Sequence, residues 1–203
     1  METSFIFAQI HFMIRHRHYI IHKPYGFLSQ FKYELKRKKK LLGELHEFAD
    51  GTMAIGRLDE DSEGLLLLTT DGLISELVRS KKISKEYYVQ VDGIIDEEAI
   101  AKLKSGVEIG FNGKKYITRK CEASLIDVSE FPLRTQKIRD DRHGPTSWLS
   151  ITISEGKFRQ VRKMTAAVGF PTLRLIRVRI GEITLANLKS GEVEEVDSFF
   201  KQK

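Results

Sequence analysis

Residues 56–72 read GRLDEDSEGLLLLTTDG and set the core of this chain. The first half, bounded by Gly56 and Gly64, holds four acidic side chains, and the second half begins with four consecutive leucines. A short apolar run between turn residues is typical of a buried strand. The sequence therefore predicts an acidic loop attached directly to a strand of the protein core.

Two structural interpretations of the acidic loop compete with a catalytic one. Asp59, Asp61 and Glu63 match the first half of a calcium-binding loop, whose twelfth position requires a bidentate Glu. That position holds Thr70. A solvated acidic turn is the second alternative, but it does not explain why Arg57 precedes the acid or why a fully apolar strand follows. We therefore predict no metal site and a catalytic role for the loop.

Residues 56–72 resemble the signature of the pseudouridine synthases that modify ribosomal RNA. In that family the Asp of the Arg-Leu-Asp triplet is the essential nucleophile, and the matching residue is Asp59. Other parts of the chain resemble further motifs of the same family. They are KPYG at 23–26, KEYYV at 85–89, and GKFRQVRKM at 156–164 followed by GFPTLRLIR at 169–177.

The resemblance implies a reaction and a set of site residues. Members of the family isomerise uridine to pseudouridine without a cofactor. Tyr87 corresponds to the tyrosine that stacks on the target uracil, and Arg162, with Arg159 second, to the cation that pairs with the catalytic Asp. Arg57 corresponds to the side chain that fills the gap left by the everted base. The remaining expected RNA contacts are Lys23, Lys85, Lys157, Arg159, Lys163, Arg174 and Arg177.

The resemblance also implies an α+β fold, a mixed and largely antiparallel sheet with flanking helices in two lobes around an active-site cleft. It covers residues 19–197, so we expect a catalytic domain over 18–197, preceded by a poorly ordered N-terminal tail at 1–17 and followed by a C-terminal tail at 198–203. The family branch is expected to be one without an N-terminal S4-type RNA-binding module. Its expected substrate is large-subunit ribosomal RNA.

Local patterns predict individual elements. Expected strands cover 19–22, 65–68, 85–91, 106–111, 121–128 and 146–153, with a hairpin turn at Asn112-Gly113. Expected helices cover 41–48, 73–78, 96–103 and 159–169, the third capped by Asp96. Tyr88 is expected in the core, and Phe158 on the apolar stripe of the last helix.

Charge is distributed unevenly along the chain. The whole sequence has 34 basic and 28 acidic residues and a net charge of +6. Between Pro132 and Ile180 there are eleven basic and three acidic residues, so this segment carries +8 and the rest of the chain carries −2. Such asymmetry predicts one face that meets a polyanion, and nucleic acid is the natural partner.

Composition limits the remaining choices. A single cysteine, Cys121, excludes an intramolecular disulfide, and we expect it to be packed rather than reactive. No apolar run reaches the roughly 20 residues of a membrane span, and the N-terminus lacks a secretory signal. We expect a cytoplasmic monomer. The alternative function from another class is a non-catalytic RNA-binding or ribosome-assembly protein, which would not need Asp59.

Overall fold

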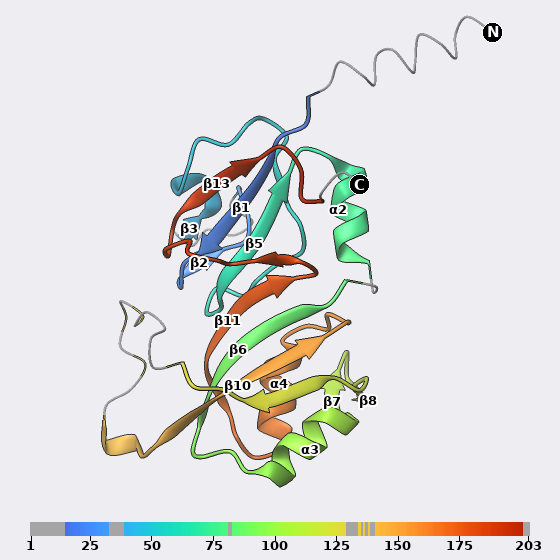
Figure 1. The fold of residues 1–203 in the computed structure, drawn as a ribbon, viewed down its shortest axis with the longest axis vertical. Coiled ribbons are helices and arrows are strands. Elements are labelled where there is room, and N and C mark those ends of the chain that lie inside the picture. Colours follow the sequence, from blue (N-terminus) through green and yellow to red (C-terminus); the bar gives the residue numbers. More distant parts are fainter. Residues whose placement is uncertain are drawn as a thin grey trace, which may run out of the picture.

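The computed structural model describes residues 15–32, 39–80, 83–128 and 141–200, together with 134, 136 and 138. Within these residues the chain folds around a mixed nine-stranded sheet flanked by helices, so the predicted α+β class is confirmed (Figure 1). The strand order is β13-β1-β5-β11-β6-β10-β9, with β4 beside β5 and β12 beside β11.

The strands of this sheet are β1 (His18–Lys23), β4 (Met53–Ala54), β5 (Glu63–Thr69), β6 (Lys85–Asp92), β9 (Glu122–Leu125), β10 (Thr146–Ile153), β11 (Thr172–Ile180), β12 (Ile183–Thr184) and β13 (Val193–Val196). Two smaller sheets pair β2 (Phe27–Leu28) with β3 (Lys40–Leu41) and β7 (Glu108–Phe111) with β8 (Lys114–Ile117). The α-helices are α2 (Gly72–Arg79), α3 (Glu97–Ser105) and α4 (Gln160–Ala167), and short 3-10 turns lie at η1 (Leu42–Glu44) and η2 (Asp141–His143).

Strand β5 is buried along its whole length, as the leucine run predicts. Alternate side chains of a strand point to opposite faces, and accordingly Leu65 and Leu67 pack with α2 residue Val78, whereas Leu66 and Leu68 pack on the other face. Because both faces are covered, the strand needs apolar residues throughout rather than alternation. The loop before β5 is therefore fixed to a rigid element.

Strands β5 and β11 run parallel, whereas the other paired neighbours in the described part of this sheet are antiparallel. The pairing joins Glu63 to Ile176 and Gly64 to Arg177, and Gly64 has φ +103°. A Cβ at Gly64 would lie 2.3 Å from the carbonyl oxygen of Arg177. Glycine is therefore required at this point for both backbone conformation and space.

Two groups of elements lie on either side of the β11–β6 junction (Figure 1). One contains β13, β1, β5 and α2, and the other contains β10, β9, α3, α4 and the β7–β8 hairpin. The second group encloses its own apolar cluster, in which Leu103 of α3 and Met164 of α4 pack on Val89 and Leu149. This arrangement agrees with the two-lobed fold that the sequence predicts.

Several local predictions are confirmed. Asp96 caps α3 by accepting a hydrogen bond from the backbone N–H of Ala99 at 2.7 Å. The 106–113 region forms the expected hairpin, β10 covers the predicted range, and α2 and α4 lie where helices were expected. The strand predicted over 121–128 is shorter and covers Glu122–Leu125.

The helix predicted over 41–48 is wrong. The chain makes the single 3-10 turn η1 there, and its apolar side chains fit a cluster that includes Tyr19 and Phe48. The hydroxyl of Tyr19 accepts a hydrogen bond from the backbone N–H of Ala49 at 3.2 Å. Tertiary packing on aromatic rings thus replaces the helix that local spacing favours.

Two core predictions are also wrong. Tyr88 is half-buried and lines a second hollow on the opposite face of β6 from Tyr87. Phe158 is 65% exposed because it precedes α4 and lies outside its apolar stripe. By contrast Cys121 is partly buried against the apolar cluster around α3 and donates to the carbonyl of Leu103, as expected of a packed thiol.

The two predicted tails lie partly outside the described residues, namely 1–14 and 201–203. Arg17, within the predicted N-terminal tail, pairs with Glu195 and donates its backbone N–H to Thr70. Phe199, within the predicted C-terminal tail, is buried and packs its ring 5.1 Å from that of His18. The packed domain therefore extends beyond residue 197. No helix in the described part of the chain has the length and apolar character to cross a membrane.

Candidate active site

A cleft of about 950 Å³ is lined by residues of the acidic loop and of the segment that leads into α4. Its walls include Asp59 and Tyr87, which the sequence placed in the active site. Predicted RNA contacts among its lining residues are Arg57, Lys85, Lys157, Arg159 and Arg177. The structure thus gathers residues from positions more than 100 apart in the sequence around one hollow.

Asp59 is held in place through the residue before it. Leu58 is buried, and both its N–H and its carbonyl bond to the hydroxyl of Ser29, at 3.0 and 2.8 Å. The Asp59 side chain is 27% exposed and accepts a hydrogen bond from Nη1 of Arg159 at 3.2 Å. The carboxylate is therefore positioned, accessible and next to a guanidinium.

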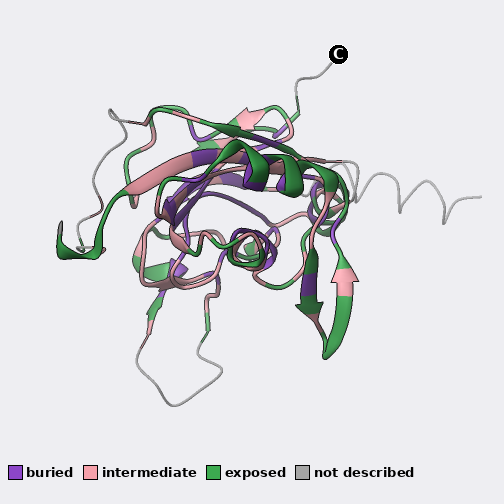
Figure 2. Cartoon of the chain, turned by 90° about the horizontal axis from the view of Figure 1, so that it is seen from below, coloured by how far each residue is buried: buried purple, intermediate pink, exposed green. Residues whose placement is uncertain are grey.

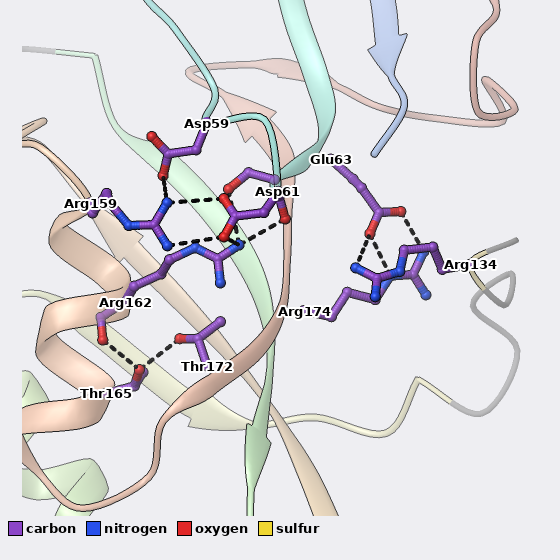
Figure 3. A network of polar contacts seen from close by, with 10 residues as sticks. Asp59, Asp61, Glu63, Arg134, Arg159, Arg162, Thr165, Thr172 and Arg174 are labelled. Atoms are coloured by element: carbon purple, nitrogen blue, oxygen red, sulfur yellow. Dashed lines mark hydrogen bonds and ion pairs between the residues drawn. The ribbon is translucent and has the colours of Figure 1, made fainter. Parts of the chain in front are cut away.

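Asp61 is the main partner of both arginines of the α4 region (Figure 3). Arg159 binds it through two hydrogen bonds of 3.0 Å, one from each terminal nitrogen. Arg162 lies 3.4 Å from its Oδ2 and donates to its backbone carbonyl at 2.8 Å. Burial alone would raise the pKa of Asp61, but these cations lower it below the ordinary range.

The structure therefore pairs Asp59 with Arg159, where the sequence favoured Arg162. Arg159 has a left-handed backbone, with φ 51°, immediately before α4. This conformation is uncommon for a residue with a side chain. Arg162 lies one turn farther along the helix, where burial lowers its pKa and its guanidinium reaches Asp61 and Ser62.

A buried ion pair lies beside this network. Glu63 and Arg174 have side chains only 3% and 5% exposed, and two hydrogen bonds of 3.0 and 2.9 Å join them (Figure 3). Arg134 approaches Glu63 at 3.9 Å. The pair joins the end of the acidic loop to β11 through charge as well as backbone contacts.

Three of the predicted RNA contacts are wrong as surface contacts, because their side chains are buried. Arg174 serves Glu63, and Arg177 is 5% exposed and donates to the carbonyl of Leu65. Lys23 is fully buried, and it donates to the carbonyls of residues 24 and 27. Burial lowers the pKa of Lys23 to about 8, against the opposing effect of Glu63 and the other nearby acids. All three side chains therefore make their contacts inside the protein, and of the three only Arg177 is among the residues that line the cleft.

The remaining predicted residues are accessible. Arg57 is exposed at the cleft, and Tyr87 is half-buried between the apolar clusters of the two lobes. Lys85 donates to the carbonyl of Ile83, and its pKa is lowered by burial and then by Arg177. Lys157 and Lys163 lie beside the β7–β8 hairpin.

The calcium-loop alternative conflicts with these partners, since guanidinium groups already bind Asp59, Asp61 and Glu63. In the described ranges no group of three or more His, Cys, Asp and Glu side chains is arranged to hold a metal ion. Sequence reasoning missed the roles of Asp61 and Glu63. The available signal was their charge complementarity with the arginines at 159, 162 and 174.

Residues 17–167 match the family model described as RNA pseudouridylate synthase. This chain belongs to the RNA pseudouridylate synthase family. It is 44% identical over 179 residues to the ribosomal large subunit pseudouridine synthase E of Vibrio parahaemolyticus, with 87% of this chain and 72% of that protein covered. It is 41% identical over 177 residues to the synthase E of Xanthomonas campestris, with 85% and 91% covered.

The fold of this synthase also has solved relatives. A crystal structure of a pseudouridylate synthase superimposes with a TM-score of 0.71 at 26% identity, and the match covers 91% of this chain and 72% of that one. The family resemblance inferred from the four motifs is therefore confirmed. Membership identifies this protein as an enzyme, a pseudouridine synthase.

Proposed function

We propose that this synthase isomerises a specific uridine to pseudouridine in large-subunit ribosomal RNA. Relatives that share 41–44% of their residues with it over most of its length are named large subunit pseudouridine synthases. The observation that carries the proposal is the Asp59 carboxylate, which lies in a cleft with an aromatic ring and touches a guanidinium.

Asp59 is the proposed nucleophile or base. The reaction breaks the bond from uracil N1 to C1′, turns the base and joins C5 to C1′, while the proton on C5 moves to solvent and N1 gains one. An ionised carboxylate suits the first step, and a nearby cation keeps it charged. Arg159 makes that contact.

Arg162 also has a proposed role in the site. Within the described residues its Nε is buried and makes no hydrogen bond, so one donor is unused beside the acidic loop. Asp59 lies close enough to oppose, in part, the lowering of the Arg162 pKa by burial. We assign Arg162 to hold the acidic loop through Asp61 and to add positive charge near Asp59.

The target uridine must leave its stack, at a cost of a few kcal/mol. Tyr87 is the proposed ring that holds the everted uracil, and Arg57 the side chain that fills the gap. Lys85, Lys157 and Lys163 are proposed phosphate contacts, which position the RNA without reading its sequence. Binding should therefore weaken steeply as salt rises.

The reaction changes no oxidation state and adds no external group, so we propose catalysis without a cofactor. Ribosomal RNA as substrate supports a cytoplasmic location. We propose that a single copy acts, because Asp59, Tyr87 and Arg159 come from one chain and line one cleft, and Arg162 of the same chain binds Asp61 beside it.

The test is to map pseudouridines in ribosomal RNA from cells with and without the gene. One large-subunit pseudouridine should disappear on deletion, return with the wild-type gene and stay absent with Asp59→Asn. Glu60→Gln is the matched control, since Glu60 is in the same loop and pairs with Lys39 at the surface. Restoration of the modification by Asp59→Asn would support a non-catalytic role.

A further inference from the structure

One aromatic side chain at the cleft has no packing role. Phe158 is 65% exposed, whereas the apolar positions of α4 that follow it, Val161 and Met164, are buried in the core. Its ring lies among polar and charged lining residues, with Nζ of Lys163 5.4 Å from its centroid. An exposed phenyl ring beside a cation in a cleft is typical of a surface that stacks on a ligand.

The β7–β8 hairpin extends this surface. Figure 2 shows the hairpin projecting from the body of the protein, largely exposed. Phe111 lies next to the hairpin turn and Tyr116 lies on the opposite strand, with ring centroids 6.2 Å apart, and Tyr116 lines the cleft. Nζ of Lys157 lies 4.8 Å from the first ring and 4.9 Å from the second. Phe158, Tyr116 and Lys157 thus line the cleft, and Phe111 and Lys163 lie beside them.

Hydrogen bonds hold this edge in a fixed shape. The hydroxyl of Tyr116 donates to Glu155 at 2.6 Å, and Glu155 also accepts the backbone N–H of Arg119 at 2.9 Å. Lys163 of α4 donates to the carbonyl of Gly110 at 2.8 Å. The hairpin is therefore tied to the segment that carries Arg159, and a ligand on it would meet rings already in position.

We propose that Phe158, Phe111 and Tyr116 form an aromatic ledge that binds unpaired nucleotides next to the target uridine. Phe158 stacks on the nearest base, and Lys157 turns from the rings to a phosphate of that strand. Lys163 keeps its bond to Gly110 and offers its other N–H donors to a second phosphate. The inference rests on the proposed function and extends it, since it makes a single-stranded segment part of the substrate. A duplex would not fit, because its base faces are covered by stacking.

The test uses fluorescence anisotropy with a labelled oligouridylate of about 12 nucleotides, a length that one such groove can span. An RNA duplex of the same length is the second probe. Every protein carries Asp59→Asn so that the probe is not converted. Phe158→Ala should weaken oligouridylate binding roughly 5- to 100-fold, the range for one stacked base, and leave duplex binding unchanged. Phe158→Trp should restore it.

The lysines give a different signature. Lys157→Gln and Lys163→Gln should each make the plot of log affinity against log salt shallower by about 0.7, the value for one phosphate of a single strand. Leu73→Ala is the matched control for Phe158→Ala, because Leu73 is also an exposed apolar residue, 72% exposed on α2, and lies outside the lining of the cleft. It should bind both probes like its parent.

The ledge is refuted if Phe158→Ala binds oligouridylate like its parent, or if it loses duplex binding to the same extent. A Phe158→Trp variant as weak as Phe158→Ala would also refute stacking. Failure of the ledge is distinct from failure of the proposed function. In the first case conversion still depends on Asp59, and in the second Asp59→Asn converts RNA normally, whatever the binding data show.

Discussion

Replacing Glu63 by glutamine should destabilise this synthase more than any surface charge change. Both partners of the Glu63–Arg174 pair are almost fully buried, at 3% and 5% side-chain exposure, and two hydrogen bonds join them. Glutamine keeps the shape but removes the charge, so the Arg174 guanidinium stays buried without that carboxylate. Breaking a buried pair by removing one partner costs about 3–5 kcal/mol.

Urea unfolding followed by circular dichroism measures this cost. With a slope of about 2–3 kcal/mol per molar urea for a chain of this size, the midpoint should fall by roughly 1–2 M with the slope unchanged. Glu60→Gln is the control. Its pair with Lys39 is 40% and 36% exposed, and exposed pairs contribute about 0–1 kcal/mol.

A double variant tests the reasoning further. Glu63→Gln with Arg174→Met removes both charges, so it should be more stable than Glu63→Gln alone even though it has lost more polar contacts. The account of the pair is refuted if Glu63→Gln shifts the midpoint no more than Glu60→Gln does.

Three further predictions concern other parts of the scaffold. Gly64→Ala should cost roughly 3 kcal/mol or more or prevent folding, because the added Cβ meets the Arg177 carbonyl at 2.3 Å and the backbone has φ +103°. Between pH 7.5 and 9.5 the free energy of unfolding of wild type should rise by about 2 kcal/mol relative to that of Lys23→Met. The reason is that the pKa of Lys23 is about 8 in the folded protein and 10.5 in the unfolded chain. Cys121 should react with iodoacetamide at pH 8 about 100-fold more slowly than an ordinary thiol, because burial raises its pKa to about 11 from 9.0.

Each of these has an outcome that contradicts it. For Gly64→Ala it is a urea midpoint equal to that of Gly56→Ala, a glycine with positive φ but open space around it. For Lys23 the direction in which stability changes with pH decides the outcome. The folded state loses its proton first, so stability must rise with pH over this window, and a fall relative to Lys23→Met contradicts the burial of a charged amine. For Cys121 it is equal alkylation rates in native and urea-unfolded protein.

The sequence alone predicts the scaffold well where local and tertiary preferences agree. The leucine run is buried on both faces as β5, and Asp96 caps its helix through the expected hydrogen bond. At 41–48 the two preferences differ, and packing around Tyr19 decides the outcome. Spacing reports which residues are apolar, but not which other segment will cover them.

The site shows the same limit. Motif resemblance brings Asp59 and Tyr87 to one cleft, but it does not show which arginine touches Asp59, because that depends on the left-handed turn at Arg159. It also treats Arg174 and Arg177 as RNA contacts, although β11 directs them into the interior. A count of basic residues cannot separate charges that meet a ligand from charges that neutralise buried acids.

The central claim is that the Asp59 carboxylate performs the chemistry. The most direct measurement is single-turnover conversion of ribosomal RNA labelled with tritium at uridine C5, with wild type and Asp59→Asn at saturating enzyme and with RNA binding measured in parallel. We predict that Asp59→Asn binds RNA within a few-fold of wild type and releases no tritium above background. Release at a rate close to that of wild type would contradict the account.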